Sequence, residues 1–127
     1  MDEIRLVLPK ERPFHRIAHL VLGGLAVRLD LTFETLEDLQ VALEELLDRY
    51  DGEHDVELVL RVLPDAIEAR VGPFESTLLR GELDRHDDSV SLGRVLDTVV
   101  DGVRIEEVGG SHYVELRKSV APLGSKA

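Results

Sequence analysis

The chain has 127 residues, of which 43% are hydrophobic, and a formal net charge of −11 at pH 7. This length and apolar content suit a single domain with one substantial core. The acidic balance argues against binding to nucleic acid or to an anionic membrane surface, because both need clustered Lys and Arg. A basic protein partner fits the charge better. The chain has no cysteine, which excludes disulfides, thiol catalysis and zinc–thiolate sites.

The N-terminal stretch MDEIRLVLPKER is acidic at its start, and its apolar run is too short for a signal peptide. No segment reaches the roughly 20 apolar residues needed to cross a bilayer. We therefore expect a cytoplasmic protein with no membrane segment.

A strand followed by a helix is predicted at the N-terminus. Apolar residues alternate at Ile4, Leu6 and Leu8 before Pro9, which is typical of a half-buried strand. From Pro13 onward the apolar spacing becomes helical and predicts a mostly buried helix. Its apolar positions are Phe14, Ile17, Ala18, Leu20, Val21, Leu25 and Leu29. The Gly23-Gly24 pair would weaken this helix by about 1 kcal/mol per glycine, so we expect another element to approach closely there.

The segment from Thr32 to Tyr50 gives the clearest helix signal. Its apolar residues recur three and four positions apart and form one buried face: Leu36, Leu39, Ala42, Leu43, Leu46, Leu47 and Tyr50. Thr32 is suited to cap the N-terminus, and Asp51-Gly52 can end the helix. The acidic side chains of this helix are typical of a solvated face. The functional alternative is a partner-binding surface made by Glu34, Glu37, Glu44 and Asp48.

The rest of the chain predicts two hairpins separated by helices. Val56 to Val71 alternates on both sides of a turn at Pro64-Asp65, and Val103 to Leu116 does so around Gly109-Gly110. Phe74 to Asp84 suggests a short helix, and Leu92 to Val99 a longer one. This order predicts an α+β two-layer sandwich, in which helices cover one face of a mainly antiparallel sheet. We expect a single domain over residues 1–118 and a flexible tail over residues 119–127.

The segment LVLGGLAVRLDLTFETLEDLQVALEEL resembles the anti-sigma factor serine kinases of the GHKL (histidine kinase-like) ATPase superfamily. The order of predicted elements agrees with that family through about residue 118. The resemblance implies the GHKL fold, a symmetric dimer, and binding to a sigma factor and to an antagonist protein.

In that family, one helix carries a glutamate used in chemistry and, four residues later, an asparagine that binds magnesium. Glu45 matches the glutamate, but Arg49 stands at the asparagine position. A guanidinium has five donors and no acceptor, so Arg49 cannot bind the metal. Glu45 is left as a remnant catalytic candidate.

The other two ATP motifs of the family also depart from its pattern. Pro73 stands in the segment where an aspartate should accept the adenine amino group, and Ser91 in the segment where glycine amides should cradle phosphate. The segment between Pro73 and Ser89 leaves little room for the family's mobile ATP lid. These three changes predict a protein without cofactors.

The sequence therefore favours a regulatory protein-binding module, similar to an anti-sigma factor, without kinase activity. One alternative is an active serine kinase that uses ATP and magnesium through an altered site. Another is a non-catalytic subunit of a related kinase. His15 and His19 have the spacing of two metal ligands, but no third ligand is evident and ordinary histidines are favoured. No metal site is expected.

Overall fold

The computed structural model describes residues 2–75 and 92–120. In chain order the strands and helices are β1 (Asp2–Leu8), α1 (His15–Leu29), α2 (Phe33–Asp48), β2 (Val56–Val62), β3 (Ala66–Phe74), α4 (Leu92–Val99), β4 (Gly102–Val108) and β5 (Ser111–Ser119). A single 3-10 turn, Arg12–Phe14, leads into α1. The five strands form one sheet in the order β1-β2-β3-β5-β4, and every neighbouring pair is antiparallel. The predicted α+β class is therefore confirmed.

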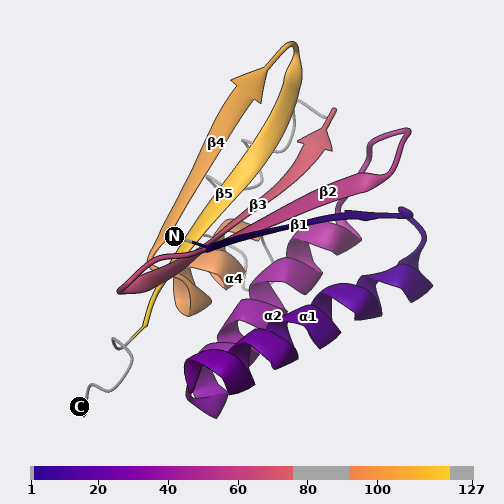
Figure 1. The fold of residues 1–127 in the computed structure, drawn as a ribbon. Helices are drawn as coiled ribbons and strands as arrows, with labels where there is room; N and C mark the ends of the chain where they lie inside the picture. The colour runs from indigo at the N-terminus through magenta and orange to yellow at the C-terminus, as the bar shows by residue number, and fades with distance from the viewer. Residues whose placement is uncertain (1, 76–91, 121–127) are drawn as a thin grey trace.

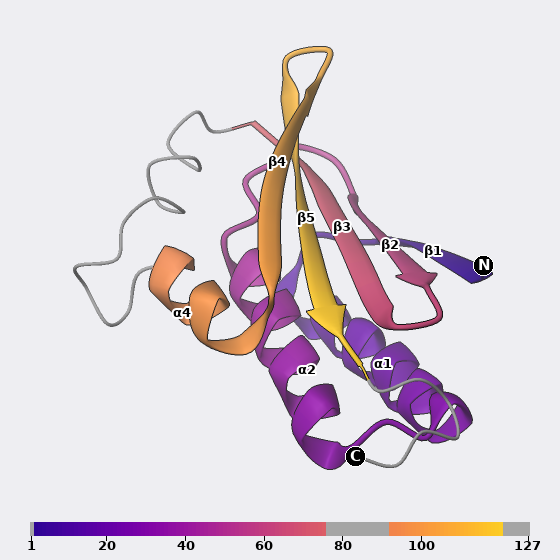
Figure 2. The ribbon, with the colours of Figure 1, turned by 90° about the vertical axis from the view of Figure 1, so that its left-hand side faces the viewer.

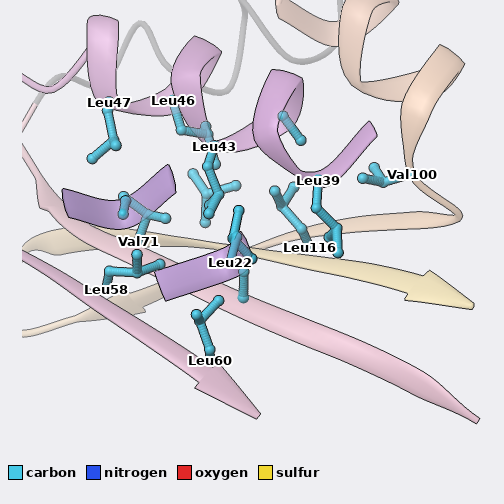
Figure 3. Packing of buried hydrophobic residues seen from close by; sticks show 14 of the residues in the cluster. Leu22, Leu39, Leu43, Leu46, Leu47, Leu58, Leu60, Val71, Val100 and Leu116 are labelled. Atoms are coloured by element: carbon cyan, nitrogen blue, oxygen red, sulfur yellow. The ribbon is translucent and has the colours of Figure 1, made fainter. Parts of the chain in front are cut away.

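The helices lie against one face of the twisted sheet, as Figures 1 and 2 show from two sides. α2 contacts both α1 and α4. The core lies between the two layers, where leucines of α1 and α2 meet inward side chains of the strands (Figure 3). Leu43, Leu46, Leu58 and Leu60 are each at most 1% exposed. Within residues 2–75 and 92–120, every helix is too short or too polar to span a bilayer.

α2 begins as the sequence predicts and ends slightly earlier. The Thr32 hydroxyl oxygen accepts a hydrogen bond from the main-chain N–H of Thr35 at 3.1 Å, which is the expected N-cap contact. At the other end, the N–H of Arg49 points to the carbonyls of Leu46 and Leu47, and Arg49 is the C-cap. The helix therefore ends before Asp51-Gly52, because its last turn tightens.

α1 differs from its prediction, because only one of its two apolar faces is buried. Ala18, Leu22 and Leu25 lie in the core, whereas Leu20 is 70% exposed and Val27 is 85% exposed. A Cβ added to Gly23 or Gly24 would have nothing within 4 Å. The expectation that another element approaches these glycines is therefore wrong for the described residues.

Both predicted hairpins are confirmed. β2 and β3 pair around Pro64-Asp65, and β4 and β5 pair around Gly109-Gly110, where both glycines have positive φ. Phe74, predicted to start a helix, ends β3 and is 1% exposed; the rest of that predicted helix lies outside the described residues.

The sheet extends slightly beyond the expected start of the C-terminal tail. β5 continues through Ser119, and the N–H of Val120 donates to the Asp65 carbonyl at 2.9 Å. Residues 119 and 120 therefore pack with the sheet, and residues 121–127 lie outside the described part of the chain.

Candidate functional site

Arg49, at the position that the family resemblance assigns to a magnesium-binding asparagine, forms an ion pair with Glu45. Arg49 Nη1 lies 2.5 Å from Glu45 Oε2 and also donates to the main-chain carbonyl of Glu45 at 3.1 Å. Both side chains are about one-third exposed or less, at 27% and 31%. The guanidinium therefore holds the carboxylate that resembles the family's catalytic glutamate. The Oε2 atom of Glu45 already accepts a charge-assisted hydrogen bond from Arg49, so this atom is less available to a metal ion or to another donor.

The end of α2 is closed by an aromatic contact with the end of β3. The rings of Tyr50 and Phe74 meet edge to face, with centroids 5.6 Å apart and an interplanar angle of 70°. The Tyr50 hydroxyl lies 3.0 Å from the carbonyl of His54 and 3.1 Å from that of Asp55. A hydroxyl has one hydrogen to donate, so these two carbonyls share it. Tyr50 thus fixes the loop after α2.

Gly52 and Asp51 complete this closure. A Cβ on Gly52 would clash with the Tyr50 ring and hydroxyl and would lie 2.9 Å from the Pro73 carbonyl oxygen. Asp51 Oδ1 accepts a hydrogen bond from the N–H of Glu75 at 2.9 Å. Pro73, which the family resemblance places in the segment of the adenine motif, therefore packs against the α2–β2 loop.

The surroundings of Tyr50 keep its phenol neutral. Burial raises the pKa of Tyr50 above 10.0, and the nearby carboxylates of Glu75, Asp51 and Asp55 raise this pKa further. The phenol therefore keeps its donor proton at neutral pH.

The acidic partner-binding candidates share one side of α2. Glu34, Glu37, Glu44 and Asp48 are all exposed, and their spacing of three, seven and four residues places them in one stripe. Asp48 already has a neighbouring cation, since Arg12 Nε lies 3.5 Å from its Oδ1. Charge available to a partner is therefore concentrated at Glu34, Glu37 and Glu44.

A shallow groove of about 460 Å³ separates this acidic stripe from the start of α1. His15 and His19 line it together with Glu44 and Asp48. His15 is 7% exposed, and its Nδ1 lies 3.9 Å from Asp48 Oδ1. Across residues 2–75 and 92–120, no three His, Asp or Glu side chains gather closely enough to hold a metal ion.

Sequence reasoning missed the closure around Tyr50. It identified Glu45 as a remnant catalytic candidate and Arg49 and Pro73 as altered site positions. Ser91, the third altered position, lies outside the described residues. Tyr50 was assigned only to the buried stripe of α2. A tyrosine followed two residues later by glycine was the available signal, but nothing local indicates that Phe74 lies across from it.

Comparison with known proteins decides the family. The serine-protein kinase RsbW of Listeria monocytogenes serovar 1/2a is 32% identical over 124 residues, which cover 82% of this chain and 79% of the relative. The chain belongs to the RsbW family. RsbW is an anti-sigma factor kinase of the GHKL group, so the resemblance seen in the sequence is confirmed.

Further RsbW relatives match over a shorter stretch. Those of L. monocytogenes serotype 4a and Listeria innocua serovar 6a are 32% and 31% identical over 77 residues, covering 55% of this chain and 49% of each relative. A crystal structure of the RsbU and RsbW domains of a Mycobacterium tuberculosis protein has a TM-score of 0.69 at 12% identity, covering 96% of this chain and 33% of that one. This likeness supports the GHKL fold of RsbW. No protein-family model matches the chain.

Proposed function

We propose that this RsbW-family chain is an anti-sigma-factor-like regulator that acts by binding proteins and does not use ATP. The observation that carries the proposal is the ion pair between Arg49 and Glu45. By resemblance, this pair stands where an asparagine should hold magnesium beside a catalytic glutamate. The guanidinium of Arg49 brings a positive charge beside that glutamate and occupies one of its oxygens, and a positive charge repels a dication.

The closure around Tyr50 supports the same proposal. Tyr50, Gly52 and Pro73 pack together at the segment where the family's adenine-binding aspartate is expected. A nucleotide base in that space would have to displace a ring held by Phe74 and by two main-chain carbonyls. Such displacement weakens binding, because the lost contacts must be replaced by the ligand.

The function would then be sequestration of a protein partner. The partner classes are a sigma factor, an antagonist of the anti-sigma type, and a second copy of the chain as a homodimer. Without nucleotide control, release would depend on competition between partners. Regulation of transcription in the cytoplasm follows as the proposed setting.

Two alternatives differ in what they require. An active kinase would keep Glu45 as a base and bind ATP through an altered site. The presence of Glu45 favours this alternative. The ion pair between Glu45 and Arg49 opposes it. A non-catalytic subunit would bind a catalytic relative instead of a sigma factor. The identity of the stoichiometric partner separates the second alternative from the proposal.

Affinity capture from the native cytoplasm tests the proposal. The unmodified chain should retain a sigma factor or a sigma-factor antagonist, and adding ATP with magnesium should leave the captured amount unchanged. Arg49→Asn serves as a matched bait, because it changes the altered site and leaves the acidic stripe intact. Capture of a kinase relative alone, or ATP-dependent release of the partner, would contradict the proposal.

A further inference from the structure

The groove between the start of α1 and the end of α2 has walls of opposite charge. Its α1 wall carries Arg12 and Arg16, and its α2 wall carries Glu44 and Asp48. These two helices pack side by side (Figure 1). The volume of the groove, about 460 Å³, lies within the usual range for small-ligand sites. The charges along the groove therefore indicate which kind of ligand it can accept.

One pair of opposite charges across the groove is closed, and the next pair is open. Arg12 Nε lies 3.5 Å from Asp48 Oδ1. Arg16 comes four residues after Arg12, and Glu44 comes four residues before Asp48, so the second pair lies about one helical turn away from the first. Arg16 and Glu44 are both exposed. Within residues 2–75 and 92–120, neither of them forms an ion pair.

Two histidines lie beside these charges. The His15 side chain is 9% exposed, and its Nδ1 lies 3.9 Å from Asp48 Oδ1. Its Nε2 is buried without a hydrogen-bond partner among the described residues. Such an atom costs stability, so this end of the groove is not arranged for stability alone. His19, one turn further along α1, also lines the groove and in its neutral form can donate or accept one hydrogen bond without adding a charge.

The mixed charge disfavours a ligand that carries one sign alone. An anion attracted by Arg16 would be repelled by Glu44 and Asp48, and a cation attracted by Glu44 would be repelled by Arg12 and Arg16. A bound metal ion is further disfavoured, because no three ligating side chains gather among the described residues. A molecule with one carboxylate and one ammonium matches both walls.

We propose that this groove binds a small dipolar molecule, whose carboxylate pairs with Arg16 and whose ammonium pairs with Glu44. The two charges of the ligand are separated by several bonds, because the ligand spans a pair of side chains that do not reach each other. A single exposed ion pair stabilises a complex little. One molecule that makes both contacts loses its translational and rotational freedom only once. The site goes beyond the proposed function and does not rest on it.

Three probes of equal carbon length test the need for both charges. γ-Aminobutyrate carries a carboxylate and an ammonium, butyrate only the carboxylate, and butylammonium only the ammonium. Each is titrated at low ionic strength into the isotope-labelled full chain, and amide chemical shifts report the site. γ-Aminobutyrate should shift the signals of Arg16 and Glu44 with saturation at roughly millimolar concentration, about tenfold more tightly than either singly charged probe. Added salt should weaken this binding, because both contacts are exposed.

Arg16→Gln and Glu44→Gln test the two walls separately. Glutamine removes the charge and favours helix about as well as the residues it replaces, so both variants should fold. Each should weaken binding of γ-aminobutyrate by about five- to tenfold. Arg28→Gln and Glu37→Gln are the matched controls, since each removes an exposed charge from the same helix outside the groove. These controls should change the affinity by less than about twofold.

Three results would overturn the proposal. The first is the absence of a saturable shift with γ-aminobutyrate, and the second is equally tight binding of butyrate or butylammonium. The third is binding by Arg16→Gln and Glu44→Gln that matches binding by their controls. The capture of a protein partner can succeed or fail independently of each result, so failure here is distinguishable from failure of the proposed function.

Discussion

Tyr50 occupies the space that a side chain on Gly52 would need. Its hydroxyl oxygen and one ring carbon would lie 2.2 and 2.5 Å from a Cβ at position 52, closer than van der Waals contact allows. The Pro73 carbonyl oxygen would also be too close, at 2.9 Å. The contact with Phe74 prevents the ring from turning away freely. The close packing of the loop after α2 against the end of β3 therefore depends on residue 52 being a glycine.

Gly52→Ala should therefore destabilise the domain by about 1–3 kcal/mol, the usual cost of overpacking. In a Tyr50→Ala background the same change should cost less, because the clashing ring is gone and only the contact with the Pro73 carbonyl oxygen remains. Urea unfolding of the four proteins in this double-mutant cycle measures the coupling. Equal costs of Gly52→Ala in both backgrounds would show that Tyr50 is not the obstacle.

Tyr50 should also give the domain a distinct sensitivity to alkaline pH. Its folded-state pKa is raised above 10.0 by burial and by Glu75, Asp51 and Asp55, so folding favours the protonated phenol. This stabilisation is complete below the unfolded pKa near 10 and is lost as pH rises through the folded-state pKa. The free energy of unfolding of the unmodified chain should fall more steeply above pH 10 than that of Tyr50→Phe. Parallel pH profiles for the two proteins would contradict this assignment.

Thr32→Ala should cost about 0.5–2 kcal/mol of stability, because the N–H of Thr35 loses its capping acceptor. Thr32→Ser is the matched control, since it keeps the hydroxyl and should remain within a few tenths of a kcal/mol of the unmodified chain. Chemical denaturation of both variants provides the comparison. If serine proved as harmful as alanine, the cap hydrogen bond would not be the cause.

Arg49→Asn alone should leave magnesium-dependent ATP binding undetectable. The change frees Glu45 and supplies a carbonyl oxygen, but the closure of Tyr50 against Phe74 remains. One metal contact cannot replace the missing contacts to the base and the phosphates. Equilibrium binding of a labelled ATP analogue to this variant, with and without magnesium, provides the check. Saturable binding by the single variant would show that Arg49 was the sole barrier.

The acidic stripe should accelerate encounter with a basic partner. Once a partner has been captured, Glu37→Lys combined with Glu44→Lys should slow association by about three- to tenfold at low salt, and the effect should shrink as salt rises. Lysines at the exposed positions Glu53 and Glu107 make a control of equal net charge. Stopped-flow measurements compare the association rate of the Glu37/Glu44 double variant with that of the Glu53/Glu107 double variant. Equal rates for both pairs would leave the stripe as a solvated face.

The parts of the fold that depend on local chemistry were predictable from the sequence. Thr32 as a cap, the stripe of α2, and the glycines of the β4–β5 turn were each marked by residue type and spacing. α1 was predicted less well, because its two apolar stripes look alike in a one-dimensional pattern. Only the packing of the layers decides that Leu22 is buried and Leu20 exposed.

Some features of the candidate site were likewise predictable from the sequence, and others were not. Arg49 could be recognised as unsuitable for magnesium from its chemistry alone, and its pairing with Glu45 follows from their spacing of four residues. The contact between Tyr50 and Phe74 could not be predicted, because it joins residues 24 positions apart across two elements. Likewise, the pairing of Asp38 with Lys118 at 3.0 Å depends on how β5 lies over α2.

The most direct test of the central claim is a calorimetric titration of the unmodified chain with ATP and magnesium. The account predicts no saturable heat up to millimolar ATP. Under the proposed function, Arg49 replaces the family's magnesium-binding asparagine, and the Tyr50–Phe74 contact lies at the segment expected to bind adenine. A catalytically competent RsbW kinase titrated under the same conditions provides the positive control. Saturable binding of ATP that requires magnesium would contradict the claim and favour the active-kinase alternative.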